Sequence, residues 1–133
     1  GPLTALAPNQ EIWLDGGHNP HAARAIARQL NNMPGRTALV AAMLASKDAT
    51  GYFMPFRQVR PEVFTLPNAP GHQGAEPQAL AEAATNAGLK AAAYDSLEAA
   101  LKAAATTGVD RILICGSLYL AGEVLAQNGE PPA

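Results

Sequence analysis

The chain has 133 residues, a formal net charge of −2 at pH 7 and one cysteine, with a sequence pI near 5.9. A chain of this length fits one domain that buries roughly two-thirds of the surface its unfolded form exposes. Without a basic excess, nucleic acid and anionic membranes are not expected as partners. No apolar stretch approaches the ~18 residues of a membrane span.

The lone cysteine, Cys115, lies in the apolar run 112–115. One cysteine excludes an internal disulfide, and this placement predicts a buried, reduced thiol. The N-terminus also lacks the basic and then apolar segments of a secretory signal. We therefore expect a cytoplasmic protein.

The first ten residues contain two prolines and no periodicity, which is typical of an interdomain linker at 1–10. A short strand is predicted at 11–14, and a polar turn leads from it into a helix at 20–30. Asn19 is a favourable N-cap for that helix. Pro20 suits its first position, where the missing N–H costs nothing.

The middle of the chain continues the alternation of strands and helices. Residues 37–43 are continuously apolar, as in a parallel strand covered on both faces. A helix is predicted at 49–56 and a third strand at 63–66. The irregular stretch 67–74 follows the carboxyl end of that strand, so we expect it at the same edge of the sheet as the earlier turns.

The last third of the chain begins with apolar residues at helical spacing, which predicts a helix at 76–87. Gly88 can adopt the left-handed conformation that ends such a helix. Asp95 and Glu98 have the spacing of a capping box for the next helix. The remaining predicted elements are a strand at 91–94, a helix from 95 to about 105, a strand from 109 or 110 to 115, a helix at 118–127 and a frayed tail at 129–133.

Strands that alternate with helices through short connections imply parallel strands and right-handed crossovers, with helices on both faces of the sheet. The sequence therefore predicts an α/β fold over residues 11–128: a Rossmann-like three-layer α/β/α domain with a mostly parallel sheet of five or six strands. In such sheets, ligands bind at the carboxyl ends of the strands.

The turn after the first predicted strand carries five residues that suit a ribose-bearing anion. Asp15 can accept hydrogen bonds from a vicinal diol, while Gly16 and Gly17 let the backbone approach a ligand closely. His18 can donate to a phosphate or carboxylate oxygen, and Asn19 caps a helix whose positive end faces the same space. The same residues also suit a purely structural turn with an exposed histidine, and spacing alone favours neither interpretation.

Two further turns carry polar residues at predicted strand ends. Lys47 offers a cation for a phosphate and Asp48 a cap for the next helix, although a solvated loop pair explains both as well. Ser117 follows Gly116 at the start of a predicted helix, an arrangement that binds anions without requiring a nucleophile. A nucleophile elbow of the G-x-S-x-G type is absent.

Metal binding is not expected. His18 and His21 lie three residues apart beside Asp15, but zinc prefers closely spaced Cys and His ligands, and the other candidates, Cys115 and His72, are distant in sequence. The sequence also lacks both a G-x-x-x-x-G-K-[ST] phosphate loop and a G-x-G-x-x-G motif. A triphosphate would therefore have to be held by another domain.

Three motifs carry a family resemblance that spans nearly the whole chain: LDGGHNP at 14–20, MLASKD at 43–48 and CGSLYLAGEV at 115–124. In this order they resemble the C-terminal domain of folylpolyglutamate synthase and bifunctional dihydrofolate synthase, within the Mur ligase family. Two positions depart from the family pattern, which usually has alanine where Gly17 stands and often aspartate where Ser46 stands.

The resemblance implies the nucleotide-closing, glutamate-binding domain of a ligase in folate biosynthesis and one-carbon metabolism. Such a ligase uses ATP and Mg²⁺ to phosphorylate the carboxylate of dihydropteroate or folate, and L-glutamate then attacks the acyl phosphate. The phosphate loop and the magnesium ligands would lie in a larger N-terminal ATPase domain, the partner of this domain. The isolated domain would be inactive, and a monomer is expected.

The resemblance assigns roles to the polar turns. It implies nucleotide binding by residues 15–19, glutamate binding by His18 and Ser117, and supporting positions in the cleft for Lys47 and Asp48. An alternative is a non-catalytic Rossmann-like module that binds a nucleotide or a partner protein, with the same turns serving only the fold.

Overall fold

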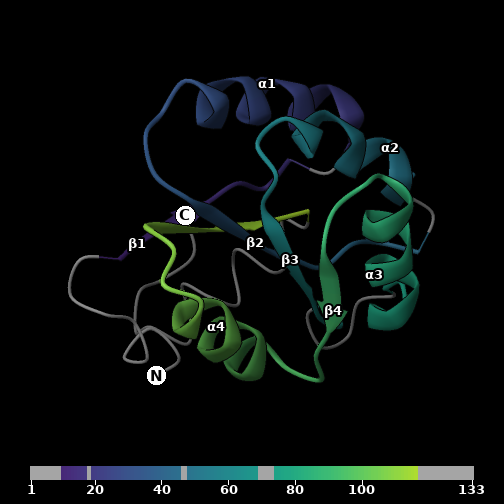
Figure 1. Cartoon of the computed structure of the whole chain (residues 1–133). Helices are drawn as coiled ribbons and strands as arrows, with labels where there is room; N and C mark the ends of the chain where they lie inside the picture. Colours follow the sequence, from purple (N-terminus) through teal and green to yellow (C-terminus); the bar gives the residue numbers. More distant parts are fainter. Residues whose placement is uncertain (1–9, 18, 46–47, 69–73, 117–133) are drawn as a thin grey trace.

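The computed structural model describes residues 10–17, 19–45, 48–68 and 74–116. Within these ranges the chain forms one sheet of five strands, all paired in parallel, in the order β1-β5-β2-β3-β4 (Figure 1). The strands are β1 (Glu11–Leu14), β2 (Thr37–Ala41), β3 (Glu62–Thr65), β4 (Ala91–Ala93) and β5 (Arg111–Cys115). The predicted parallel sheet is confirmed.

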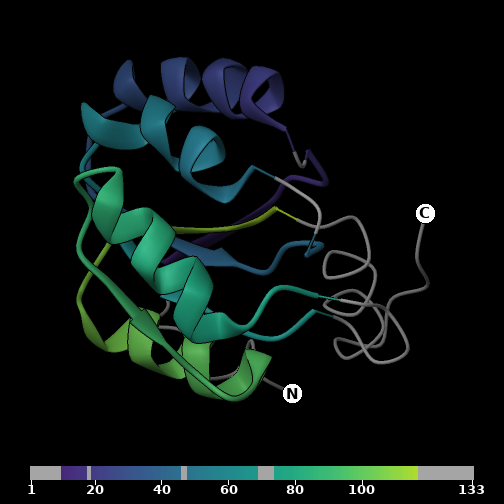
Figure 2. The same cartoon turned by 90° about the vertical axis from the view of Figure 1, so that its right-hand side faces the viewer.

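Helices cover both faces of this sheet, and the three-layer prediction is confirmed as well (Figure 2). They are α1 (Pro20–Asn31), α2 (Ala49–Phe53), the short 3-10 helix η2 (Met54–Arg57), α3 (Pro77–Asn86) and α4 (Leu97–Thr106). Helices α1, α2 and α3 share one face, whereas α4 lies on the other. This follows from right-handed crossovers, because the chain moves one way across the sheet from β1 to β4 and then returns to place β5 between β1 and β2.

The two faces of the sheet have separate apolar cores. Along β2, Leu39 and Ala41 belong to the core under α1, α2 and α3, while Ala38 and Val40 belong to the core under α4. Successive strand residues point to opposite faces, so a strand covered on both sides must be apolar throughout. This explains why every residue of β2 and β5 is buried, whereas the edge strands β1 and β4 are only partly so.

Two local predictions differ from the structure. The predicted helix at 49–56 is divided into α2 and η2, because Pro55 has no N–H to donate one turn back and the chain tightens into a 3-10 turn. The capping box of Asp95 and Glu98 is wrong: the N-cap of α4 is Ser96, whose hydroxyl accepts from the Ala99 N–H at 3.1 Å. Either residue could have capped the helix, and the N-cap lies one position later than predicted.

Other predicted ends are confirmed. Asn19 is the N-cap of α1 with Pro20 in its first turn, and Gly88 follows α3 with φ of 91°. Residues 1–9 of the predicted linker at 1–10, the predicted final helix at 118–127 and the tail at 129–133 lie outside the described residues. Gln10 is described, and its Nε2 donates to the Ala105 and Val109 carbonyls at 3.0 and 2.9 Å. None of the helices that the structure describes is long and apolar enough to cross a bilayer.

Candidate functional site

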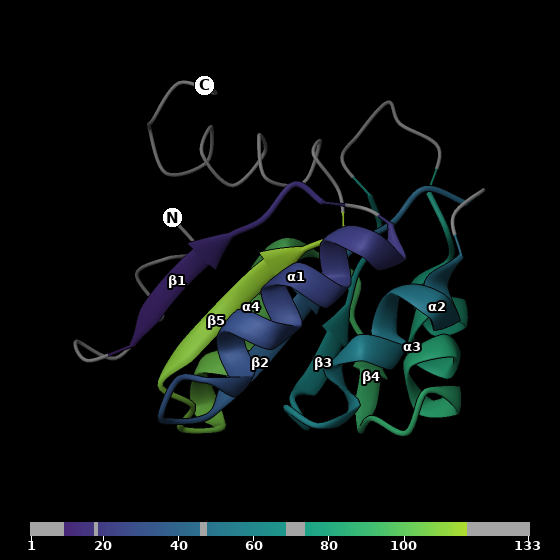
Figure 3. The same cartoon turned by 90° about the horizontal axis from the view of Figure 1, so that it is seen from above.

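The carboxyl ends of the strands form one edge of the sheet, where the polar turns meet (Figure 3). The ladder continues a residue or two past the strands: the Asp15 N–H donates to the Ile114 carbonyl at 2.9 Å, and the Leu66 N–H donates to the Ala41 carbonyl at 3.1 Å. Because β5 lies between β1 and β2, the turns after all three of these strands are neighbours.

The turn after β1 is closed by Asp15 itself. Its Oδ1 accepts from the Gly17 N–H at 3.1 Å, while its Oδ2 has no hydrogen-bond partner among the described residues. A Cβ atom on Gly17 would lie 2.6 Å from the Cβ of Ala22, so glycine fits this turn without any shift of the helix. The half-buried Asp15 therefore holds the turn with one oxygen and keeps a second acceptor for a hydroxyl donor.

The side chain of Asn19 is committed to the helix. Its Oδ1 accepts from the Ala22 N–H at 2.9 Å, and its carbonyl accepts from the Ala23 N–H at 3.1 Å. Since Pro20 has no N–H, this end of α1 offers the positive end of a helix dipole rather than a row of unused donors. His18, which precedes it, lies outside the described residues.

The turn after β2 also serves a helix. Asp48 Oδ1 accepts from the Gly51 N–H at 2.9 Å, which confirms the prediction that Asp48 caps the next helix. Lys47 and Ser46 lie outside the described residues. Residues on both sides of the irregular stretch 67–74 lie at this edge too, because the Ala75 N–H donates to the Met43 carbonyl at 2.9 Å. Pro67, Asn68 and Gly74 to Pro77 line a hollow of about 310 Å³ there.

The chain leaves β5 through a glycine that no other residue could replace without strain. Gly116 has φ of 88°, and a Cβ atom at this position would lie 2.5 Å from the Ala42 carbonyl oxygen. Its backbone is thus closely packed against the end of β2. Ser117, the next residue, lies outside the described residues.

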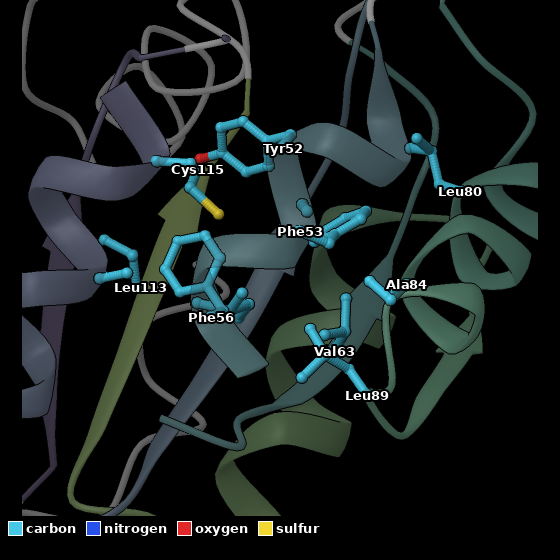
Figure 4. Close-up of a cluster of buried hydrophobic side chains, with 14 of the residues drawn as sticks. Tyr52, Phe53, Phe56, Val63, Leu80, Ala84, Leu89, Leu113 and Cys115 are labelled. Carbon is cyan, nitrogen blue, oxygen red and sulfur yellow. The ribbon is translucent and has the colours of Figure 1, made fainter. Parts of the chain in front are cut away.

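Tyr52, to which the sequence assigned no role, lies in the core beneath this edge. The ring comes from α2, is completely buried, and directs its hydroxyl towards Cys115 (Figure 4). The hydroxyl makes no hydrogen bond of normal geometry with the described residues, although the Cys115 thiol and the Gly116 backbone lie close enough to influence its pKa. Within an apolar helical pattern a tyrosine gives no signal that distinguishes it from ordinary core, so nothing in the sequence pointed to this arrangement.

Both of these buried groups are neutral at physiological pH. Burial, reinforced by the neighbouring Cys115 and Asp15, raises the pKa of Tyr52 far above its usual range. Burial likewise raises the pKa of Cys115 to about 12. The thiol is 1% exposed, which confirms the predicted buried cysteine and leaves it unreactive.

The described residues hold no group of three or more His, Cys, Asp or Glu side chains able to bind a metal ion. His21 is exposed on the first turn of α1. His18 and His72, the other candidates for a metal site, lie outside the described residues.

The structure therefore gathers the described members of the predicted site at one edge of the sheet: Asp15, Gly16, Gly17, Asn19 and Asp48. It gives Asn19 and Asp48 capping roles, and among the described residues the second carboxylate oxygens of both Asp15 and Asp48 have no hydrogen-bond partner. An exposed edge with bare glycine backbone, carboxylate oxygens and a helix dipole can hold a hydroxyl-bearing anion, but not by itself a triphosphate.

A family model for "Mur ligase, glutamate ligase domain" matches residues 4–118. A dihydrofolate synthase/folylpolyglutamate synthase of Escherichia coli strain K12 is 28% identical over 129 residues, which make up 94% of this chain and 29% of that protein. The resemblance indicated by the three sequence motifs is confirmed.

Solved structures agree on the fold. Folylpolyglutamate synthase of Mycobacterium tuberculosis complexed with ADP and AMPPCP matches with a TM-score of 0.82 at 24% identity, over 92% of this chain and 30% of that one. The bifunctional folylpolyglutamate synthase/dihydrofolate synthase of Yersinia pestis, complexed with AMPPNP and Mn ion, matches with a TM-score of 0.72 at 26% identity, over 89% of this chain and 28% of that one. The chain spans less than a third of the length of these relatives.

Proposed function

The chain belongs to the Mur ligase family, as its glutamate ligase domain, and on that premise we propose that it closes over the nucleotide in an ATP-dependent ligase. The reaction is the addition of L-glutamate to dihydropteroate or folate. ATP supplies a phosphoryl group to the folate or pteroate carboxylate, and the amine of glutamate displaces it to form an amide. The relatives named above support the proposal, because they are folate ligases crystallised with adenine nucleotides or their analogues.

The observation that carries the proposal is the second oxygen of Asp15. One oxygen accepts from the Gly17 N–H, and the other has no hydrogen-bond partner among the described residues at the edge where β1 and β5 end. A ribose hydroxyl is a donor of the right kind for this acceptor, and the bare backbone of Gly16 and Gly17 leaves room for the sugar. In this proposal Asp15 orients the ribose.

The other predicted site residues lie in or next to the turns that neighbour Asp15, and their proposed roles depend on those positions. His18 lies between Gly17 and Asn19 in sequence, and Ser117 follows Gly116, so we propose that these two side chains bind the incoming glutamate and the reacting phosphate region. Asn19 and Asp48 hold the starts of α1 and α2 through their Oδ1 atoms and so position the turns. Lys47 supports the cleft as a cation. Phosphoryl transfer needs this kind of positioning more than covalent chemistry by the protein.

The triphosphate and Mg²⁺ call for groups outside this chain. The sequence has no phosphate loop, and the part of the chain that the structure describes has no cluster of carboxylates for a metal. We propose that both are held by a larger N-terminal ATPase domain of the same cytoplasmic, monomeric protein. On this proposal, the 133 residues alone do not turn over ATP, folate and glutamate.

The variant that isolates the proposed role is Asp15→Asn in the full-length ligase. Asparagine retains an oxygen that can accept from the Gly17 N–H, but it replaces the second acceptor by an NH₂ donor. Ligation assays should show a KM for ATP raised about tenfold or more, the loss expected when a hydrogen bond to a charged group is removed. Unfolding in urea should show little change.

The matched control is Asp110→Asn at the opposite edge of the sheet, where Asp110 Oδ2 accepts from the Arg36 N–H at 2.8 Å. It should leave the KM for ATP unchanged. If Asp15→Asn, His18→Ala and Ser117→Ala all ligate at near-normal rates in the full-length protein, the proposal is wrong. That outcome would favour the non-catalytic module.

A further inference from the structure

A groove lined by four arginines is formed by residues of α1, η2 and the turn after η2. The side chains are Arg24 and Arg28 from α1, Arg57 from η2 and Arg60 from the turn that follows. All four residues are exposed, and the hollow between them measures about 870 Å³. Four of the nine basic residues in the chain thus gather at one hollow.

The local structure explains how the four side chains come together. Arg24 and Arg28 are four residues apart, which places them on the same side of α1. The chain then returns from α2 through η2, where Arg57 ends the helix and Arg60, with φ of 54°, turns towards β3. Non-glycine residues rarely adopt a positive φ, so this turn presents Arg60 at a cost in backbone energy.

None of the four arginines forms an ion pair with a described side chain, although Arg57 and Arg60 also line an adjoining hollow with Glu62. No carboxylate lines the groove. The ion pair that the described residues do form, Lys90 with Glu62, does not include any of the four arginines. Helix dipoles favour Arg28 and Arg57, which lie in the last turns of α1 and η2, but they do not account for Arg24 or Arg60.

We propose that this groove binds a small organic anion that carries at least two phosphate or carboxylate groups. Guanidinium groups bind both kinds of group through paired, charge-assisted hydrogen bonds, and all four cations here are arginine rather than lysine. Met54, Pro55 and Val59 add apolar surface for the carbon skeleton, and the volume suits a small molecule.

This site is separate from the proposed nucleotide edge. Arg57 and Arg60 precede the amino end of β3, whereas Asp15 follows the carboxyl end of β1. The inference therefore does not rest on the ligase proposal, and either can fail without the other.

Isothermal titration calorimetry of the 133-residue chain with two probes, tripolyphosphate and tricarballylate, tests the inference. At least one probe should bind saturably, and the affinity should fall as ionic strength rises. The double variant Arg28→Gln with Arg57→Gln should weaken binding by about tenfold or more. Lys102→Gln on α4, the same change of charge away from the groove, should leave the affinity within about twofold.

The probe that binds more tightly identifies phosphate or carboxylate as the preferred group. Absence of saturable binding for both probes would overturn the inference. So would equal affinities of the double variant and the unchanged chain, because the anion would then bind elsewhere, for example at the nucleotide edge. Circular dichroism checks the fold of each variant, and if the double variant does not fold, Arg24→Gln alone, at an exposed helix position, must weaken binding for the inference to stand.

Discussion

The guanidinium carbon of Arg111 lies 5.8 Å from the centroid of the Trp13 ring. Arg111 begins β5, is only 5% exposed, and reaches across its neighbours on both sides. Its Nη1 donates to Thr37 Oγ1 at 2.8 Å and its Nη2 donates to the Pro34 carbonyl. One buried cation therefore connects β1, β5 and β2 at the amino edge of the sheet, far from the turns that carry the candidate site.

We expect Arg111→Met to lower the free energy of unfolding by about 2 to 4 kcal/mol, because the Thr37 hydroxyl and the Pro34 carbonyl lose a charged donor. Urea unfolding followed by circular dichroism measures the change. Arg36→Met is the control, since the exposed Arg36 side chain has no partner among the described residues, and it should stay within about 0.5 kcal/mol. Equal effects of the two substitutions would contradict the bridging role of Arg111.

Tyr52→Phe should stabilise the chain by about 1 kcal/mol, because the buried Tyr52 hydroxyl makes no hydrogen bond of normal geometry with the described residues, its neighbours being the Cys115 thiol and the Gly116 backbone. The ring contacts with Phe53 and Phe56, at centroid distances of 5.6 and 5.9 Å, remain in the variant. Thermal unfolding measures the shift. Tyr94→Phe, at a half-buried ring, should change little, and a loss of stability in Tyr52→Phe would mean that the hydroxyl is bonded after all.

Gly116→Ala should cost about 3 kcal/mol or more, because a positive φ and a close contact with the Ala42 carbonyl act together. Gly108→Ala separates the two causes: Gly108 has φ of 77°, but a Cβ atom there would meet nothing within 4 Å. This control should cost about 1 kcal/mol in urea unfolding. Similar costs at the two positions would show that the contact with the end of β2 does not matter.

Stability should fall as the pH rises above 9, and Cys115 should contribute to the fall. Folding raises the pKa of this thiol from 9.0 to about 12. Between these values the unfolded chain loses the thiol proton that the native chain keeps. The contribution of the Cys115 thiol to the free energy of unfolding is therefore fully present below pH 9 and is lost as the pH approaches 12. The expected slope is about 1.4 kcal/mol per pH unit.

Urea unfolding between pH 8 and 11 measures this slope, with Cys115→Ala as the comparison, because other groups titrate in the same range. The difference in unfolding free energy between the two chains should shrink as the pH rises. Iodoacetamide should react with the unfolded chain at pH 8.5 but leave the native thiol unmodified. Rapid alkylation of the native chain at that pH would show that Cys115 is accessible.

Much of the fold could be predicted because its determinants are local. Continuous apolar runs mark the doubly covered strands, and the caps at Asn19 and Asp48 depend on hydrogen bonds to residues three positions away. The positions of these polar turns at strand ends follow from the same pattern. The capping prediction for α4 failed by one residue because Asp95 and Ser96 are both good caps, and the turn of the chain rather than residue type selected Ser96.

The amino-acid sequence by itself determined the alternation of strands and helices, the helix caps and the set of polar residues available at the strand ends. The tertiary structure alone decided that β5 lies between β1 and β2, which brings Asp15 beside the carboxyl end of β5. It also decided the burial of Arg111 over Trp13 and the gathering of arginines from α1 and η2. These features depend on contacts between segments that are distant along the chain. The period of a sequence pattern shows which face of a helix or strand is buried, but it does not show which other element packs against that face.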